Sequence, residues 1–114
     1  MKYVRFLINN EKKYGLLKDS KISELKDSFF STTENSGRIY DIDSVKLLPP
    51  VTPSKIIALG YNYKDLVGDR DEYDEPVVFL KPSSTVIGHG DNIEITTVMS
   101  KVWTEVELCI VIGK

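Results

Sequence analysis

The chain has 114 residues, of which 41% are hydrophobic and 28% charged, and its formal net charge at pH 7 is −2. Its length allows a buried core, and its scattered Lys and Arg argue against nucleic acid as a partner, because a phosphate-binding surface needs a basic stripe. No apolar run approaches the roughly 20 residues of a membrane span, so no membrane partner is expected. A single cysteine and the lack of a signal-peptide pattern favour a cytoplasmic location.

The first 48 residues have the pattern of a small β-rich module. Apolar alternation and polar turn residues predict, in order, a strand at 2–8, a turn at 9–13, a strand at 14–17 and a turn at 18–21. The mixed periodicity of residues 22–30 fits a strand followed by one helical turn. Residues 31–37 have the composition of a loop, and residues 40–48 lead out of the module.

The clearest boundary is a proline-rich connection at residues 49–54. Three prolines in five residues (49, 50 and 53) impose a stiff, extended backbone and cannot lie in a central strand. The sequence therefore predicts a module over residues 1–48 and a second part over residues 55–114.

The second part is predicted to contain short strands separated by polar loops. Apolar runs indicate strands at 55–59, 77–81 and 92–97. The acid-rich residues 65–75 fit a surface loop or a short helix, and residues 86–91 fit a turn.

Residues 102–114 are predicted to form the last strand, because β-branched and aromatic residues alternate there with a two-residue period. Glu105 and Glu107 would share one face, roughly 6.5 Å apart along the strand. They adjoin a run that is apolar on both faces, where an unpaired acid is costly. From spacing alone, a solvated strand face is the more common explanation of this pair, and a metal site is the alternative.

Five landmarks follow one another along the second part. They are PVTPSKII at 50–57, GYNYKD at 60–65, PVVFLKPSS at 76–84, GHGDNI at 88–93 and EVELCIVIGK at 105–114. Together they closely resemble the fumarylacetoacetate hydrolase superfamily, which includes acylpyruvate hydrolases, oxaloacetate decarboxylases, isomerases and sugar-acid dehydratases. The first half is also similar, less specifically, to the variable N-terminal module of that family.

The resemblance implies a mainly β fold (β-rich α+β), in which the N-terminal module precedes part of a mixed β-sandwich roll, and a homodimer. It also implies a Mg²⁺ or Mn²⁺ cofactor held by three carboxylates. Two of these map onto Glu105 and Glu107, and the third belongs to a downstream acid that this chain lacks. Because the family's catalytic domain has roughly 200 residues, the chain is expected to hold only its opening portion.

The implied substrate is a small 2-oxo acid. Hard cations prefer oxygen ligands, and a 2-oxo acid offers its carboxylate and keto oxygens to such an ion, which can stabilise an enolate as a Lewis acid. Decarboxylation, dehydration, isomerisation and C–C hydrolysis all remain open. A second hypothesis is a truncated, non-catalytic module with an assembly or interaction role only, since the last apolar strand would be exposed or paired with another chain.

Three further residues receive roles from the resemblance. Lys81 would be catalytic, meeting the substrate carboxylate or a developing enolate, although an exposed lysine at a strand end is the plain alternative. Tyr61 and Asn62 would line the mouth of the site, or simply form a turn. Where the family has a water-activating His and Glu, this chain has Leu66 and Asp69, and this departure weakens the case for hydrolysis.

The remaining candidates have simpler explanations. His89 is expected to be a surface residue in a turn, and Cys109 a small core residue of the last strand. Residues 69–75 are expected to be a solvated loop, with a lid over the site as the functional alternative.

Overall fold

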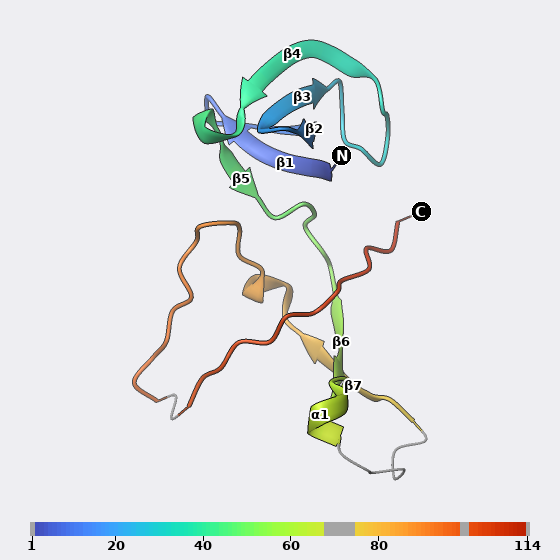
Figure 1. Cartoon of the computed structure of the whole chain (residues 1–114), viewed down its shortest axis with the longest axis vertical. Coiled ribbons are helices and arrows are strands. Elements are labelled where there is room, and N and C mark those ends of the chain that lie inside the picture. Colours follow the sequence, from blue (N-terminus) through green and yellow to red (C-terminus); the bar gives the residue numbers. More distant parts are fainter. Residues whose placement is uncertain (1, 68–74, 99–100, 114) are drawn as a thin grey trace.

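The computed structural model describes residues 2–67, 75–98 and 101–113, and of Leu66 and Val67 only the backbone (Figure 1). Its first half is a five-stranded antiparallel sheet with the strand order β4-β3-β2-β1-β5. The strands are β1 (Lys2–Ile8), β2 (Glu11–Lys18), β3 (Lys21–Leu25), β4 (Asn35–Asp41) and β5 (Lys46–Leu48). A 3₁₀ turn, η1 (Ile42–Ser44), joins β4 to β5.

Tight hairpin turns give the first sheet its register. Asn9 and Asn10 have φ values of 48° and 62°, and Asp19 and Ser20 have 48° and 65°. Positive φ at both central residues is the geometry of a two-residue hairpin turn that matches the twist of the strands, and Asn and Asp tolerate it. The predicted strand at 2–8 is therefore confirmed. The second strand begins at residue 11 rather than 14, because the ladder continues to the end of the hairpin.

The core of the module lies on one face of this sheet. The Phe6 and Ile22 side chains are fully buried, and Leu25 is 2% exposed. Gly15 lies between Phe6 and Ile22, where a Cβ atom would come within 2.5 Å of Ile22 Cγ2. A glycine is thus required at position 15, where the Ile22 side chain packs directly against the backbone of β2.

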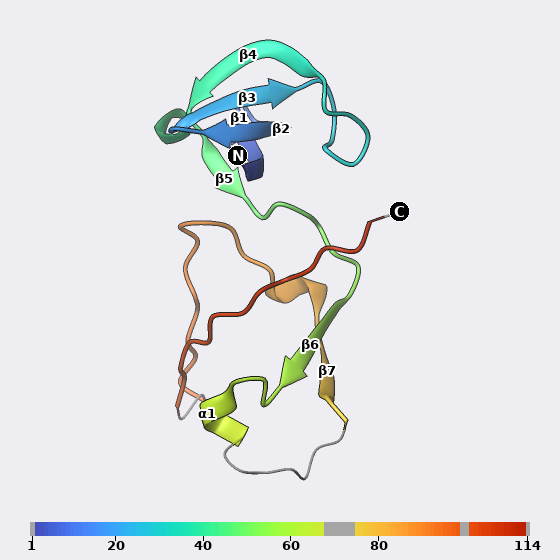
Figure 2. The ribbon, with the colours of Figure 1, turned by 45° about the vertical axis from the view of Figure 1, so that its right-hand side comes forward.

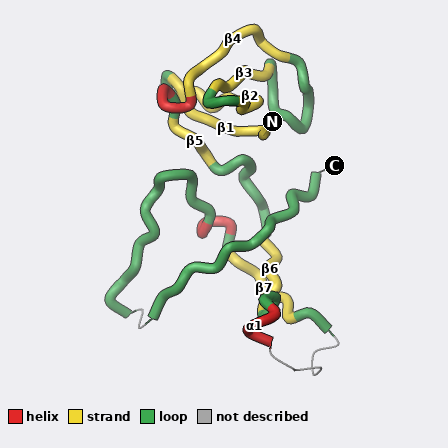
Figure 3. The backbone as a smooth tube through the Cα atoms, viewed as in Figure 1, coloured by secondary structure: helices red, strands yellow, loops and turns green. Residues whose placement is uncertain are grey.

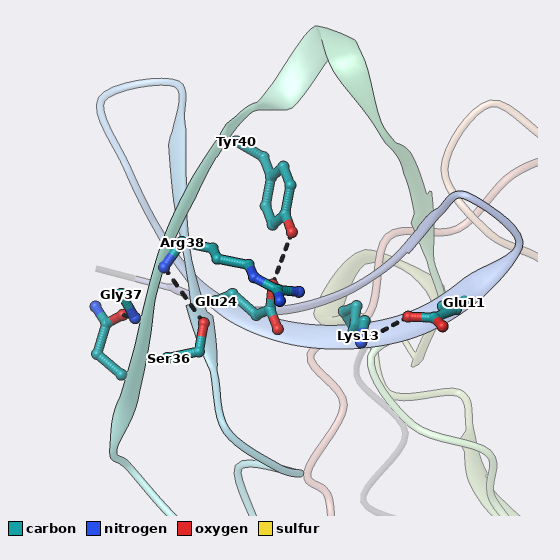
Figure 4. A network of polar contacts seen from close by, with 8 residues as sticks. Glu11, Lys13, Glu24, Ser36, Gly37, Arg38 and Tyr40 are labelled. Carbon is teal, nitrogen blue, oxygen red and sulfur yellow. Dashed lines mark hydrogen bonds and ion pairs between the residues drawn. The ribbon is translucent and has the colours of Figure 1, made fainter.

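A buried carboxylate lies at the edge of this core (Figure 4). Glu24 is 5% exposed, and its Oε2 atom accepts a hydrogen bond of 2.8 Å from the Tyr40 hydroxyl. Arg38 Nη1 lies 4.0 Å from the same oxygen. A salt bridge of 2.7 Å joins Glu11 and Lys13 nearby. The contacts of Tyr40 and Arg38 with Glu24 join β4 to its neighbour β3, since a buried acid requires such partners.

The predicted loop at residues 31–37 is partly wrong. Strand β4 begins at Asn35, which pairs with Leu25 across an irregularity in β3. The strand predicted within 22–30 ends at Leu25, and a turn follows in which the Thr32 amide donates to the Ser28 carbonyl. The pairing partner in β3, rather than local composition, decides where β4 starts.

The second part contains the antiparallel pair β6 (Ile56–Gly60) and β7 (Val77–Lys81), with a helical turn α1 (Lys64–Val67) after β6 and a 3₁₀ turn η2 (Ser83–Thr85) after β7. The proline-rich connection links it to the sheet above (Figure 2). Among its described residues only Ala58 is a buried apolar side chain, while Ile57 and Leu80 are 67% and 70% exposed. The two predicted strands are confirmed, but they enclose little core.

The predicted strands at 92–97 and 102–114 are wrong for the residues that the structure describes. Both stretches are drawn as loop in Figure 3, and residues 102–113 have no strand assignment. A strand needs a neighbour to receive its backbone hydrogen bonds, and none of the described strands pairs with either stretch. Leu108 and Ile112 are accordingly 95% and 87% exposed.

Polar contacts tie the first sheet to the residues that follow it. Arg5 Nη1 donates to Thr52 Oγ1 of the proline-rich connection over 2.6 Å, and Lys46 Nζ pairs with Asp91 Oδ1 of the second part over 2.8 Å. The radius of gyration is 18.0 Å, against about 13 Å for a compact domain of this size. The fold is thus mainly β, as predicted, with one packed module and one open part. No helix in the described ranges is long and apolar enough to cross a membrane.

Candidate functional site

The turn after β6 has an unusual backbone. Tyr61 follows the last residue of β6 and has a φ of 54°, in the left-handed region that bulky residues avoid. Its side chain is 60% exposed. Residues held in such conformations cluster at binding and catalytic sites, where surrounding contacts maintain them. The turn at residues 60–63 is therefore a candidate site element on backbone geometry as well as on sequence.

A hydrogen bond brings this turn to the pair of glutamates. The Tyr63 hydroxyl donates to the backbone carbonyl of Val106, the residue between Glu105 and Glu107. Two segments 43 residues apart in sequence thereby meet. Glu105 and Glu107 are both exposed, and Glu105 Oε1 accepts a hydrogen bond of 3.2 Å from Trp103 Nε1.

Glu105 and Glu107 are the candidate metal ligands. Their carboxylates are the hard oxygen donors that Mg²⁺ and Mn²⁺ prefer, which fits the expected ions. Within the described ranges, however, no group of three or more His, Cys, Asp and Glu side chains is placed to hold an ion. Glu105 and Glu107 would therefore hold a metal only together with ligands from elsewhere.

Lys81 lies at the end of the β6–β7 ladder opposite the turn at residues 60–63. It pairs with Ile56 at one end of the β6–β7 ladder, whereas Gly60 pairs with Val77 at the other, four residues or roughly 13 Å away. Its ammonium group lies 5.8 Å from the centre of the Phe79 ring. In the part of the chain that the structure describes, Lys81 forms no ion pair with either glutamate.

The remaining candidates divide three ways. His89 is exposed in the turn that Gly88 and Asp91 close, as expected of a surface residue. Cys109 is exposed, so its prediction as a core residue is wrong, because none of the described strands pairs with its segment. Asp69 and most of the proposed lid lie outside the described residues.

Tyr63 is the functional candidate that sequence reasoning missed. It belongs to the landmark at residues 60–65, but a tyrosine before a short helix gives no local indication of a partner 43 residues away. The one sequence feature that pointed to Tyr63 was the landmark at residues 60–65, from which only Tyr61 and Asn62 were predicted to line the site.

Two domain families match the chain. Residues 1–50 match the domain described as Rv2993c-like, N-terminal, and residues 55–114 match that described as fumarylacetoacetate (FAA) hydrolase C-terminal. The second match covers more than half of the chain. The chain belongs to the fumarylacetoacetate hydrolase family.

Individual relatives agree with this family assignment. The chain is 38% identical over 94 residues to Protein Rv2993c of Mycobacterium tuberculosis, a match that covers 80% of this chain and 35% of the relative. It is 41% identical over 83 residues to oxaloacetate tautomerase YisK of Bacillus subtilis, covering 67% and 28% of the two proteins.

A solved structure supports the fold. The crystal structure of 5-carboxymethyl-2-hydroxymuconate delta-isomerase from Mycobacterium smegmatis superposes with a TM-score of 0.64 at 27% identity. The alignment covers 76% of this chain and 35% of that one. The chain spans about a third of the length of the curated relatives named above.

Proposed function

We propose that the chain supplies the opening part of a metal-dependent site that interconverts the keto and enol forms of a small 2-oxo acid. The observation that carries the proposal is the hydrogen bond from Tyr63 to Val106, which joins the turn at 60–63 to the Glu105 and Glu107 pair. These are two of the landmarks shared with the family. A relative named as an oxaloacetate tautomerase and a structural neighbour named as an isomerase favour this reaction over the other reactions of the superfamily.

In this proposal, Glu105 and Glu107 hold Mg²⁺ or Mn²⁺ through their carboxylates. The ion, when bound, supplies a Lewis acid that polarises the keto oxygen of the substrate. The Tyr61 hydroxyl and the Asn62 amide offer hydrogen bonds that orient the substrate carboxylate. Lys81 offers a positive charge to the same anion, for which its ammonium group leaves the Phe79 ring.

The absence of a water-activating pair agrees with this reaction. Keto–enol interconversion moves one proton between a carbon and the keto oxygen, and it consumes no water. Leu66 occupies the position where the hydrolases of the family have a proton-transferring histidine, and a leucine cannot transfer a proton. Tautomerisation needs a group that carries this proton but no activated water, whereas C–C hydrolysis needs an activated water.

A second candidate function is a non-catalytic piece that acts by association. Its support is the open second part of the chain, where Leu108 is 95% and Ile110 is 81% exposed. Surfaces of this kind in soluble proteins mark contacts with other polypeptide. The two candidates differ in whether the chain accelerates any reaction.

An assay of oxaloacetate tautomerisation distinguishes the two candidate functions. The ultraviolet absorbance of the enol form is monitored as it decays, with and without Mg²⁺. The proposal expects a Mg²⁺-dependent rate that Glu107→Gln lowers by at least about 100-fold, since a Lewis acid contributes several kcal/mol. Glu94→Gln, which removes an exposed acid elsewhere in the chain, is the matched control and is expected to leave the rate unchanged. A chain that never exceeds the uncatalysed rate would favour the non-catalytic function.

A further inference from the structure

The Tyr63 hydroxyl contacts the backbone at the peptide that separates the two candidate metal ligands. We propose that Tyr63 is a positioning residue, which fixes this peptide and thereby the relative directions of the Glu105 and Glu107 carboxylates. The inference rests on the proposed function, because it concerns the same pair. It adds a residue that touches neither the ion nor the substrate.

The geometry of the peptide explains why one bond matters. The Val106 carbonyl belongs to the peptide plane that ends at the nitrogen of Glu107. Holding the oxygen therefore restricts ψ of Val106 and φ of Glu107, the two torsions that set how the Glu107 side chain leaves the backbone relative to Glu105. Glu105 has its own contact, since its carboxylate accepts a hydrogen bond from the Trp103 indole.

The lack of a paired strand beside residues 101–113 in the described structure makes this restriction of the Val106–Glu107 peptide important. No described strand pairs with residues 101–113, so the ladder that would normally hold a Glu-x-Glu strand is missing there. An unpaired backbone loses conformational entropy when two carboxylates must converge on one ion. A hydrogen bond that restricts the peptide in advance reduces that loss, as preorganisation does in other binding sites.

The position of Tyr63 also follows from the local fold. Tyr61 has a left-handed conformation directly after β6, and α1 begins at Lys64, directly after Tyr63. Tyr63 therefore lies in a short segment between a strand and a helical turn. It is 42% exposed, so its hydrogen bond competes with water and its effect is expected to be moderate.

Titration of the 114-residue chain with Mn²⁺ alone tests the role, with paramagnetic broadening of backbone amide NMR signals as the readout. In the unmodified chain, broadening is expected to centre on residues 105–107. In Tyr63→Phe, which keeps the ring and removes the hydroxyl, the Mn²⁺ dissociation constant is expected to rise about 3- to 10-fold, the range of one hydrogen bond. Thermal unfolding of the first sheet is expected to stay unchanged.

Tyr40→Phe is the matched control, since it removes a hydroxyl that bonds Glu24 in the other half of the chain. It is expected to lower the unfolding temperature of the first sheet and to leave the Mn²⁺ dissociation constant unchanged. Unchanged affinity in Tyr63→Phe, with broadening still centred on 105–107, would overturn the positioning role and spare the proposed function. Equal weakening in both variants would overturn it as well, by pointing to general destabilisation. No broadening at 105–107 in the unmodified chain would overturn both proposals.

Discussion

Single residues matter most where the first sheet is closely packed. Gly15 is the clearest case, because its Cα lies against both a side chain and a backbone oxygen. A Cβ there would come within 2.5 Å of Ile22 Cγ2 and 2.9 Å of the Ser23 carbonyl oxygen. Real Cβ atoms do not approach so closely, and Ile22 is fully buried and cannot move into solvent.

Gly15→Ala is therefore expected to lower the free energy of unfolding by about 3 kcal/mol, the upper range for overpacking a core. Urea unfolding followed by circular dichroism measures this change. Gly113→Ala is the control, since its added Cβ would lie at an ordinary contact distance of 3.6 Å from the Phe30 ring. A Gly15→Ala variant as stable as the control would contradict this account of the core.

Sequence patterns located some of these residues and missed others for physical reasons. Asn9 and Asn10 have side chains suited to positive φ, so the first turn was predictable from local chemistry. The contact between Tyr63 and Val106 was not, because it depends on how two distant segments meet. The site roles of Lys81, Tyr61 and Asn62 stay predictions, as do those of the two glutamates.

Among the strands, too, local sequence decides some features and distant segments decide others. Strand β7 has the predicted bounds, Val77–Lys81, because its apolar residues have β6 as a partner. Residues 102–113 have the stronger β pattern but pair with none of the described strands, and they have no strand assignment. Alternation therefore predicts the capacity to form a strand, while the available neighbours decide whether it forms.

The apolar stretch at residues 108–112 is expected to promote self-association, and a homodimer remains proposed on this basis. Replacing Leu108 and Ile110 by lysine places charges on side chains that are 95% and 81% exposed. The double variant is expected to sediment as a smaller species, because charged residues block edge-to-edge pairing. Its free energy of unfolding is expected to change by less than about 0.5 kcal/mol, since neither side chain is packed.

The control for this experiment adds the same two charges outside the apolar stretch, at Thr96 and Thr97, which are also exposed. Sedimentation velocity compares the three proteins at several concentrations. If both lysine pairs reduce association equally, net charge rather than the apolar stretch is responsible.

At the scale of the whole molecule, a salt bridge holds β5 to the turn at residues 88–91. Lys46 Nζ lies 2.8 Å from Asp91 Oδ1, and the Gly88 amide donates to Asp91 Oδ2 over 2.8 Å. The hydrogen bond from Lys46, and then that from the Gly88 amide, lower the pKa of the Asp91 carboxyl below its usual 3.8. A carboxylate with a lowered pKa in the folded state stabilises that state above its unfolded pKa, and this contribution is lost as the pH falls through the folded pKa.

Asp91→Asn is therefore expected to lower the urea midpoint slightly near pH 7, and the difference is expected to shrink as the pH drops below about 3.8. The effect is small because the pair is exposed to solvent. Asp43→Asn, a neighbouring exposed acid without an ion pair in the described structure, controls for the change in net charge. A difference that grows toward acid would show that Asp91 does not act through its charge.

The first sheet is built from neighbouring hairpins, and this has a consequence for the order of folding. Strands β1, β2 and β3 pair with their immediate neighbours in sequence, so their contacts close short loops and are expected to form quickly. The sheet contains most of the buried side chains of the described structure. During synthesis, the N-terminal module can fold while later residues are still emerging from the ribosome. The folded module would then offer Lys46 as a preformed contact for Asp91 when the second part folds.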